Sequence, residues 1–163
     1  MAKIEQLFER FGEKADFATI YIAEAHAAEE WSLKHSSNAE LDGKWDVAQP
    51  KTMDERMKVF TDWYEWLSPT SPHYVDTISN EARFAFNALP ERLYIIEDGK
   101  VVYRGDAGPF GYHPEEIESW LVSRFPGHSD DVVDPEVDAP LAMMNKGLGG
   151  SKPKAVAATA SKM

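Results

Sequence analysis

Apolar side chains near the amino terminus recur with the spacing of a helix, at Ile4, Leu7, Phe8 and Phe11. Residues three and four apart share one helix face, and Gly12 marks the expected end of this helix. The next run, residues 17–22, is short, apolar and partly β-branched. Such a run favours a buried strand over a turn of helix. The pattern therefore predicts a helix followed by a strand.

Two longer helices are predicted from their first residues. Thr52 and Glu55 have the spacing of a capping box, and the helix that they open is expected to reach Leu67 before Ser68-Pro69 stops it. Its apolar residues lie on more than one side, so we expect it to be well covered. Near residue 114, a proline at the first helical position and acids in the first turn predict a final helix with one apolar face.

Between these helices the pattern predicts a short strand, a short helix and a hairpin. The strand covers residues 73–76, and the helix is expected to be capped by Ser79 and to run through Phe86. The hairpin pairs residues 92–97 with 100–104 around Asp98-Gly99, the dipeptide best suited to a type I′ turn. Pro90 stands just before the hairpin. A proline in that place, followed by a hairpin and a final helix, is the arrangement of the C-terminal part of a thioredoxin-like α/β fold with a mixed sheet, in which this proline is cis. The first strand–helix step of that fold is missing from the pattern.

The composition changes abruptly after Phe125. Aromatic residues vanish, an acidic stretch is followed by glycines, and the chain continues in Lys, Ala, Ser and Thr. Such a segment buries too little apolar area to offset its ordering entropy. We therefore expect a domain at residues 1–126 and a largely disordered tail at 127–163, in which only residues 141–144 are apolar enough to dock. A polar insertion follows the strand at 17–22 and is long for a loop.

Charge and cysteine content exclude several functions. The chain has 163 residues, 28 acidic against 17 basic side chains, a net charge of −11 and no cysteine. Strong negative charge opposes binding to nucleic acid and to anionic lipid surfaces. Without cysteine, these residues form no disulfide, thiolate metal site or thiol nucleophile. The longest apolar stretch has seven residues, far short of the roughly 20 that a bilayer needs. We expect a cytoplasmic protein with no membrane segment.

Glu24 and His26 are the residues best placed for proton transfer. They stand two apart directly after the strand, so they share a face if the extended conformation continues. In open α/β sheets, ligands bind at the carboxyl ends of the strands. A carboxylate beside an imidazole raises its pKa and makes it a candidate acid near neutral pH. An ordinary strand-end hydrogen bond is the alternative. The five histidines lack the spacing of metal ligands, so no metal site is predicted.

Several segments, in this order and at similar spacing, resemble the iodothyronine deiodinase family. They are residues 20–26 with Trp31, 75–77, 88–96, 98–105 and 108–116. The resemblance covers roughly residues 5–125. It implies a thioredoxin-like fold with an insertion after the second strand. It also implies reductive removal of iodine from thyroid hormones by a selenocysteine or cysteine, with a thiol reductant as co-substrate and no bound cofactor. Two copies of the chain can pair in this family.

The resemblance also assigns roles to individual residues. Glu24 and His26 match the acid and the histidine beside the catalytic selenium. The residues expected at or near the bound substrate are Tyr21, Trp31, Asp76 and Arg92.

The sequence departs from the family at three places. Ala23 replaces a glutamate, Pro50 stands where a second histidine is common, and Met1 aligns a few residues after the selenocysteine. Selenocysteine is encoded by UGA, which gene prediction reads as a stop, so the frame would be assigned from the next methionine; a true truncation is the alternative. As written, the chain lacks the nucleophile and a central strand, which would leave two strand edges unpaired. We therefore expect residues 1–163 alone to be marginally stable and inactive.

Three functions remain open on the sequence. The first is a reductive deiodinase acting on iodothyronines or related halogenated phenols, with its nucleophile supplied upstream of Met1. The second is a thiol-dependent peroxidase or thioredoxin-like reductase, since one fold serves many chemistries. The third is a binding module without catalysis, which has lost the nucleophile and uses the cleft of Glu24, His26 and Arg92 for partners.

Overall fold

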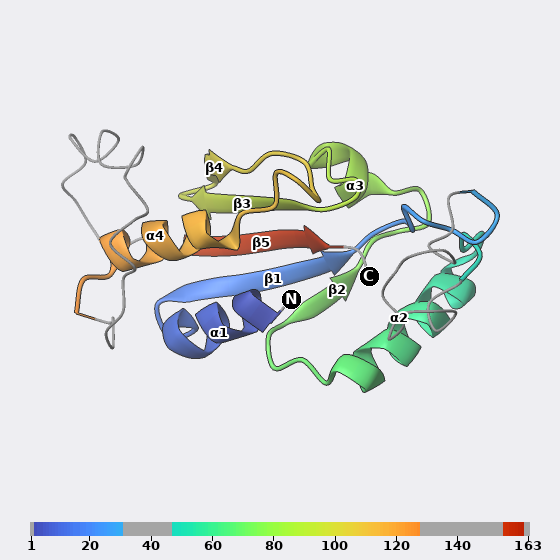
Figure 1. The fold of residues 1–163 in the computed structure, drawn as a ribbon, viewed down its shortest axis with the longest axis horizontal. Coiled ribbons are helices and arrows are strands. Elements are labelled where there is room, and N and C mark those ends of the chain that lie inside the picture. Colours follow the sequence, from blue (N-terminus) through green and yellow to red (C-terminus); the bar gives the residue numbers. More distant parts are fainter. Residues whose placement is uncertain (1, 31–46, 128–154, 162–163) are drawn as a thin grey trace.

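A five-stranded mixed sheet forms the centre of the molecule in a computed structural model, which describes residues 2–30 and 47–127 and the backbone of 155–161 (Figure 1). Along the sheet the strands lie in the order β2-β1-β5-β3-β4. β1 runs parallel to β2 and β5, whereas β3 is antiparallel to β4 and β5. The fold is thus mixed α/β. The strand bounds are β1 Ala15–Tyr21, β2 His73–Val75, β3 Arg92–Glu97, β4 Lys100–Arg104 and β5 Ala155–Ser161.

Two helices, α1 (Ala2–Phe11) and α4 (Pro114–Arg124), pack on one face of the sheet. The predicted helical face of α1 is confirmed, because Ile4, Leu7 and Phe11 are all 1% exposed or less. Gly12 closes the helix with a 2.8 Å hydrogen bond from its N–H to the Phe8 carbonyl. These helices and the alternate residues of β1 and β3 form the main core. The buried residues of this core are Ile4, Leu7, Phe11, Ala15, Phe17, Leu93, Ile95, Ile117 and Leu121.

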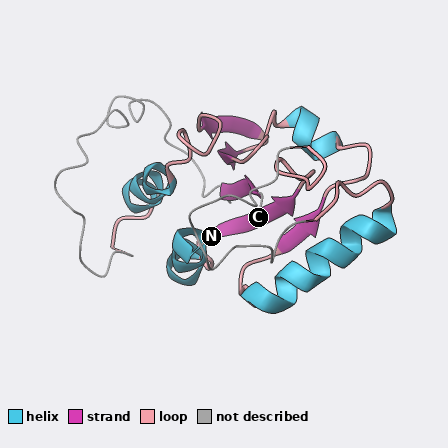
Figure 2. Cartoon of the chain, turned by 45° about the vertical axis from the view of Figure 1, so that its right-hand side comes forward, coloured by secondary structure: helices cyan, strands magenta, loops and turns pink. Residues whose placement is uncertain are grey.

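Helix α2 (Met53–Leu67) begins with the predicted capping box but is less covered than predicted. The Thr52 hydroxyl accepts the Glu55 N–H at 3.2 Å, and the Glu55 carboxylate accepts the Thr52 N–H at 3.2 Å. Only Arg56 and Trp63 are buried, whereas Trp66 is 52% exposed. The reason is position: α2 lies beyond β2, at the edge of the sheet (Figure 2), so one narrow side of the helix meets the rest of the molecule. No helix in the described ranges is long and apolar enough to cross a membrane.

Helix α3 (Glu81–Ala85) starts one residue later than predicted, because Ser79 is not its cap. Asn80 takes the N-cap position in the left-handed conformation, with φ of 61° and no side-chain cap of its own. The acceptors come instead from Asp76, whose carboxylate binds the N–H groups of Ala82 and Arg83, both at 2.9 Å. A carboxylate six residues upstream replaces the local cap. Such a cap cannot be deduced from the usual N-cap spacing.

The hairpin of β3 and β4 follows the prediction closely. Asp98 and Gly99 have φ values of 51° and 72°, and positive φ at both central residues is the mark of a type I′ turn. A register shift between Ile95 and Ile96 bends the ladder. The Leu89–Pro90 peptide bond that precedes the hairpin is cis, as is Gly108–Pro109.

The central strand β5 comes from the segment for which the sequence predicts disorder. It pairs with β1 along residues 155–161 and with β3 along residues 155–160, so it joins the two halves of the sheet. The expected open edges of β1 and β3 are therefore paired. Backbone hydrogen bonds on both sides hold such a strand without large apolar side chains, which is why composition alone did not indicate it. Residues 128–154, with the apolar stretch 141–144, lie outside the described residues.

Candidate functional site

The candidate site lies at the edge of the sheet where β1 and β2 end and β3 begins. Tyr21, the last residue of β1, pairs with Val75 of β2 and with Ser161 of β5. Arg92 opens β3 opposite Ala160 of β5. In Figure 1 the arrowheads of β1, β2 and β5 point to this edge, and β3 runs away from it. The candidate residues of the sequence are brought to the carboxyl ends of parallel strands, where α/β sheets bind ligands.

A buried hydroxyl–carboxylate pair is the chemical centre of this edge. Tyr21 and Glu24 are 3% and 6% exposed, and the Tyr21 hydroxyl donates a hydrogen bond to the Glu24 carboxylate. Burial and the charge of Glu24 raise the pKa of Tyr21 far above its usual value, while the positive charge of Arg56 acts weakly in the opposite direction. Tyr21 therefore stays protonated near neutral pH. It acts as a fixed donor that orients the carboxylate.

Gln49 fixes the backbone of Glu24 from the far side of the polar insertion. Its side-chain oxygen accepts the Glu24 N–H at 3.0 Å, and its side-chain nitrogen donates to the Glu24 carbonyl at 2.8 Å. The Gln49 N–H in turn donates to the Glu29 carboxylate at 2.9 Å. The Gln49 side chain thus satisfies the backbone N–H and carbonyl of Glu24, as a neighbouring strand does for the residues of β1. Gln49 could not be identified from the sequence, because an isolated glutamine in a polar stretch carries no distinctive pattern.

Asp76 is buried directly beside this pair and organises the segment that follows β2. It is 4% exposed, and its own N–H donates to the Tyr21 carbonyl at 2.8 Å. Its carboxylate accepts the N–H of Thr77 at 2.8 Å in addition to the two N–H groups at the start of α3. All its hydrogen bonds described here are therefore with the backbone. Asp76 thus lies beside the Tyr21–Glu24 pair and supports the backbone around it.

Arg56 of α2 is a buried cation that was not predicted from the sequence. It is 1% exposed, and its guanidinium donates to the Asp76 and Thr77 carbonyls at 3.3 and 2.5 Å and to the Asn80 side-chain oxygen at 2.9 Å. A signal for it existed. Arg56 falls four residues before Phe60 and seven before Trp63, on the helix face that carries the buried tryptophan. An arginine in line with a buried aromatic face indicates a buried guanidinium.

A cavity of about 250 Å³ lies against Glu24. Its wall is formed by three parts of the chain: the residues just after β1, the segment before α2 with its first turn, and the segment from β2 to β3. The polar lining residues are Glu24, Glu30, Gln49, Arg56, Asn80 and Arg83. Apolar residues, among them Ile78 and Leu89, complete the wall. A cavity with both acidic and basic groups suits a polar or charged ligand.

The other predicted site residues lie outside this lining. His26 is half-buried two residues beyond Glu24, where the chain bends, so the extended conformation that would align the two side chains ends at Glu24. Arg92 is 9% exposed, and its Nε is buried without a partner in the described structure. Trp31 lies outside the described residues. Within the described ranges no group of three histidine, aspartate or glutamate residues could hold a metal ion.

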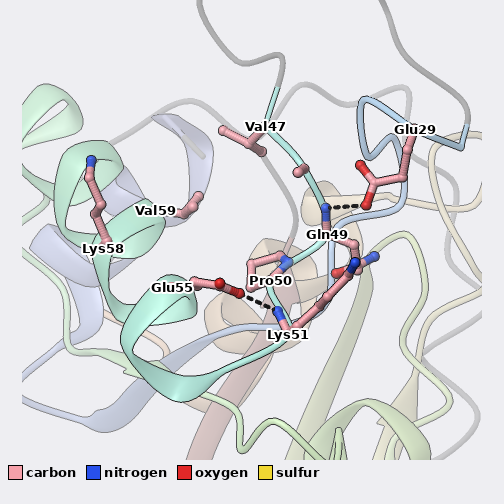
Figure 3. A pocket seen from close by; sticks show the side chains of 9 residues that line it. Glu29, Val47, Gln49, Pro50, Lys51, Glu55, Lys58 and Val59 are labelled. Atoms are coloured by element: carbon pink, nitrogen blue, oxygen red, sulfur yellow. Dashed lines mark hydrogen bonds between the residues drawn. The ribbon is translucent and has the colours of Figure 1, made fainter.

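A second cavity of about 360 Å³ shares Gln49 and Pro50 with the first (Figure 3). It lies between residues 47–51 and the first turns of α2, where Figure 3 shows the Val59 side chain turned from the helix toward Pro50. Three of the four charged side chains in its lining, those of Glu29, Glu55 and Lys58, are already engaged, and the fourth is Lys51. Glu55 completes the capping box, Glu29 binds Gln49, and Lys58 pairs with Asp62 at 2.7 Å. We therefore assign the candidate site to the cavity at Glu24.

The geometry defines an α/β protein with a polar cavity at the edge of its sheet, next to a buried tyrosine–glutamate pair. Comparison with known proteins places it more narrowly: the family model described as iodothyronine deiodinase matches residues 1–125, and the chain belongs to this family.

Its relatives are deiodinases of vertebrates. The type I iodothyronine deiodinase of Xenopus laevis is 39% identical over 121 residues, which are 74% of this chain and 44% of that protein. The thyroxine 5-deiodinase of Bos taurus is 30% identical over 74% of this chain and 38% of that protein. The thyroxine 5-deiodinase of Gallus gallus is 33% identical over 68% and 40%, respectively. The chain thus spans less than half the length of each of these relatives.

Proposed function

We propose that this chain forms the substrate-binding and proton-handling part of a reductive deiodinase, with iodothyronines or related halogenated phenols as substrates. The observation that carries the proposal is the family match over residues 1–125. The buried pair of Tyr21 and Glu24 beside a charged cavity supports it, because proton transfer needs oriented acid–base groups next to bound substrate. A thioredoxin-like fold, with Pro90 as its cis-proline, is part of the same proposal.

The proposed reaction requires two electrons from thiols. An aryl–iodine bond breaks and an aryl–hydrogen bond forms, while two thiols become a disulfide and release iodide and one proton. The 163 residues contain no cysteine. We therefore assign the thiol or selenol that takes up iodine to a group outside these residues, and the second thiol to a reductant in solution. The residues present here would bind the substrate and deliver the proton.

Roles follow from this division. His26 would donate the proton to the ring carbon, and the pair of Tyr21 and Glu24 would fix the strand end that carries it. Arg92 would hold the substrate, with Trp31 contributing from the insertion. Asp76 would act through the backbone, since its carboxylate binds N–H groups.

The test supplies the missing thiol in solution. Purified chain is mixed with thyroxine labelled with radioactive iodine and with excess dithiothreitol, and released iodide is counted. Binding is followed in parallel by quenching of tryptophan fluorescence. We expect binding, no iodide release by the chain alone, and, once dithiothreitol supplies the thiol, iodide release above that of dithiothreitol alone. His26→Ala should lower the release at least about tenfold, since a general acid contributes about 100-fold or more. His113→Ala, which removes an exposed histidine before α4, should leave it unchanged.

A binding module without catalysis is the second candidate, and the absence of cysteine favours it. It predicts thyroxine binding with no iodide release at any dithiothreitol concentration. The outcome that contradicts both proposals is a chain that folds and binds no iodothyronine. Reduction of hydrogen peroxide faster than release of iodide would instead favour a thiol-dependent peroxidase.

A further inference from the structure

We propose that Arg83 and Glu30 bind the amino-acid end of an aromatic ligand, with Arg83 taking the carboxylate and Glu30 the ammonium group. The inference rests on the proposed function in one respect: both use the cavity at Glu24.

The two arginines in the cavity wall differ in what they already bind. The Arg56 guanidinium is buried and donates to two carbonyls and to Asn80, so its hydrogen bonds hold the protein together. Arg83 is half-buried, and no carboxylate of the described residues lies within ion-pair distance of its guanidinium. A guanidinium that lines a cavity without an acidic partner is suited to an anionic group of a ligand.

Arg83 is also held in place from two sides. Its backbone N–H donates to the buried Asp76 carboxylate at 2.9 Å, which fixes the start of its side chain. Its guanidinium carbon lies 4.9 Å from the centre of the Phe84 ring, within the range of a cation–π contact. Both contacts restrict the Arg83 side chain before a ligand binds, so they lower the entropic cost of binding a carboxylate.

The two acidic side chains in the cavity wall, Glu24 and Glu30, also differ in accessibility. The Glu24 carboxylate receives the hydrogen bond of Tyr21 and is buried, whereas Glu30 is exposed at the wall of the same cavity. Glu30 follows β1, and Arg83 lies in α3, so the accessible anion and cation come from different segments of the wall. An α-amino acid carries both complementary charges on one carbon.

The size of the cavity indicates that only one end of a large ligand enters it. Its volume of about 250 Å³ is below the roughly 300–1,000 Å³ of pockets that enclose a drug-sized molecule. Ile78 lines the cavity and is 37% exposed. Phe84, whose ring contacts the Arg83 guanidinium, is 66% exposed. These apolar side chains offer a surface for the aromatic part of the ligand. An aromatic amino acid therefore matches both the charges and the shape.

Three ligands separate the two charges in a binding assay. Thyroxine carries the carboxylate and the ammonium group, its deaminated acid tetraiodothyroacetic acid only the carboxylate, and its decarboxylated amine only the ammonium group. We expect Arg83→Gln to weaken thyroxine and the acid about tenfold or more and to leave the amine unchanged. Glu30→Gln should weaken thyroxine and the amine and spare the acid. Arg83→Lys, which keeps the charge, should retain most of the affinity.

Lys100→Gln is the matched control, because it removes one exposed positive charge at the turn of the hairpin, away from the cavity. Circular dichroism and urea unfolding establish that each variant is folded. Equal loss for all three ligands in Arg83→Gln, or no loss for any, would overturn the inference.

A fourth ligand separates this inference from the proposed function. Iodine-free L-thyronine should bind to the wild-type chain and lose affinity in Arg83→Gln, whether or not iodide is ever released from thyroxine. Binding of this kind without iodide release would leave the inference standing and contradict deiodination. Iodide release that is insensitive to Arg83→Gln, with unchanged KM for thyroxine, would do the reverse.

Discussion

At the scale of single residues, the buried guanidinium of Arg56 joins helix α2 to the wall of the candidate site. It binds two main-chain carbonyls and an amide oxygen from the segment between β2 and α3. Arg56→Met would leave those acceptors buried without a donor, and we expect a loss of about 2–3 kcal/mol in the free energy of unfolding. Urea unfolding measures this loss.

Lys58→Met is the matched control for Arg56→Met on the same helix. The Lys58 side chain is 76% exposed, and among the described residues its ion pair is with Asp62, four residues on. An exposed pair of this kind contributes less than about 1 kcal/mol. If both variants lost equal stability, the buried hydrogen bonds of Arg56 would not be what holds the segment.

The sequence could indicate some of these residues but not their connections. Glu24 was identifiable because it follows an apolar strand, and Arg56 was identifiable in principle from its place on the face of Trp63. The bonds of Gln49 to Glu24 and of Asp76 to α3 could not be deduced, because each joins positions whose approach depends on the finished fold. Local patterns identify residue types, and tertiary structure decides their partners.

At the scale of elements, α1 is attached at both ends by carboxylates. Glu5 binds Thr70 and Ser71 before β2, and Glu118 of α4 binds Lys3 and Arg10 of α1. Partial burial alone would raise the pKa of Glu5, but the hydrogen bonds from Ser71 and Thr70 outweigh it and lower the pKa below its usual value. For Glu118, burial is likewise outweighed by Lys3 and Arg10.

This attachment predicts a pH-dependent stability. A carboxylate whose pKa is lower in the folded chain contributes stability above its unfolded pKa of 4.5, and the contribution is lost as pH falls through the folded pKa. Glu5→Gln should therefore cost about 0.5–1 kcal/mol at pH 7, after allowance for solvent screening, and less and less below pH 4.5.

Urea unfolding at several pH values between 7 and 3 tests this element, with Glu9→Gln as the control on the exposed side of α1. The stability curves of wild type and Glu5→Gln should converge at low pH, and Glu9→Gln should follow the wild type throughout. A constant gap between wild type and Glu5→Gln would show that the carboxylate charge has no part in docking the helix.

The elements differ in how far apart in the sequence the residues that predict them lie. The capping box of α2 and the type I′ turn of the hairpin involve residues at most three apart, and both were predicted correctly. The prediction that α2 is well covered by the rest of the molecule was wrong. An apolar helix surface indicates burial only where another element lies against it, and the position of α2 beyond an edge strand is a property of the sheet.

At the scale of the whole molecule, β5 connects the two halves of the sheet, the pair β1–β2 and the pair β3–β4. Composition indicated a disordered tail, and loss of a central strand indicated a marginally stable chain. In the structure, residues 155–161 pair with β1 on one side and with β3 on the other, and no direct pairing of β1 with β3 is described. The stability of the sheet, and with it the edge that carries Tyr21 and Arg92, thus depends on this strand.

Two proline substitutions test that dependence through the backbone alone. Ala158 lies in the middle of β5, opposite Ala18 and Tyr94, where proline would remove a ladder hydrogen bond and clash with the neighbouring strand. We expect Ala158→Pro to lower the free energy of unfolding by about 3 kcal/mol or more. It should also speed hydrogen exchange at the amides of β1 and β3.

Ala155→Pro is the control, because proline is tolerated at the first residue of a strand. If the two variants unfolded at the same urea concentration as the wild type, with unchanged exchange in β1 and β3, the two halves of the sheet would be stable without β5. The family core at residues 1–125 would then have to hold its site by α1 and α4 alone.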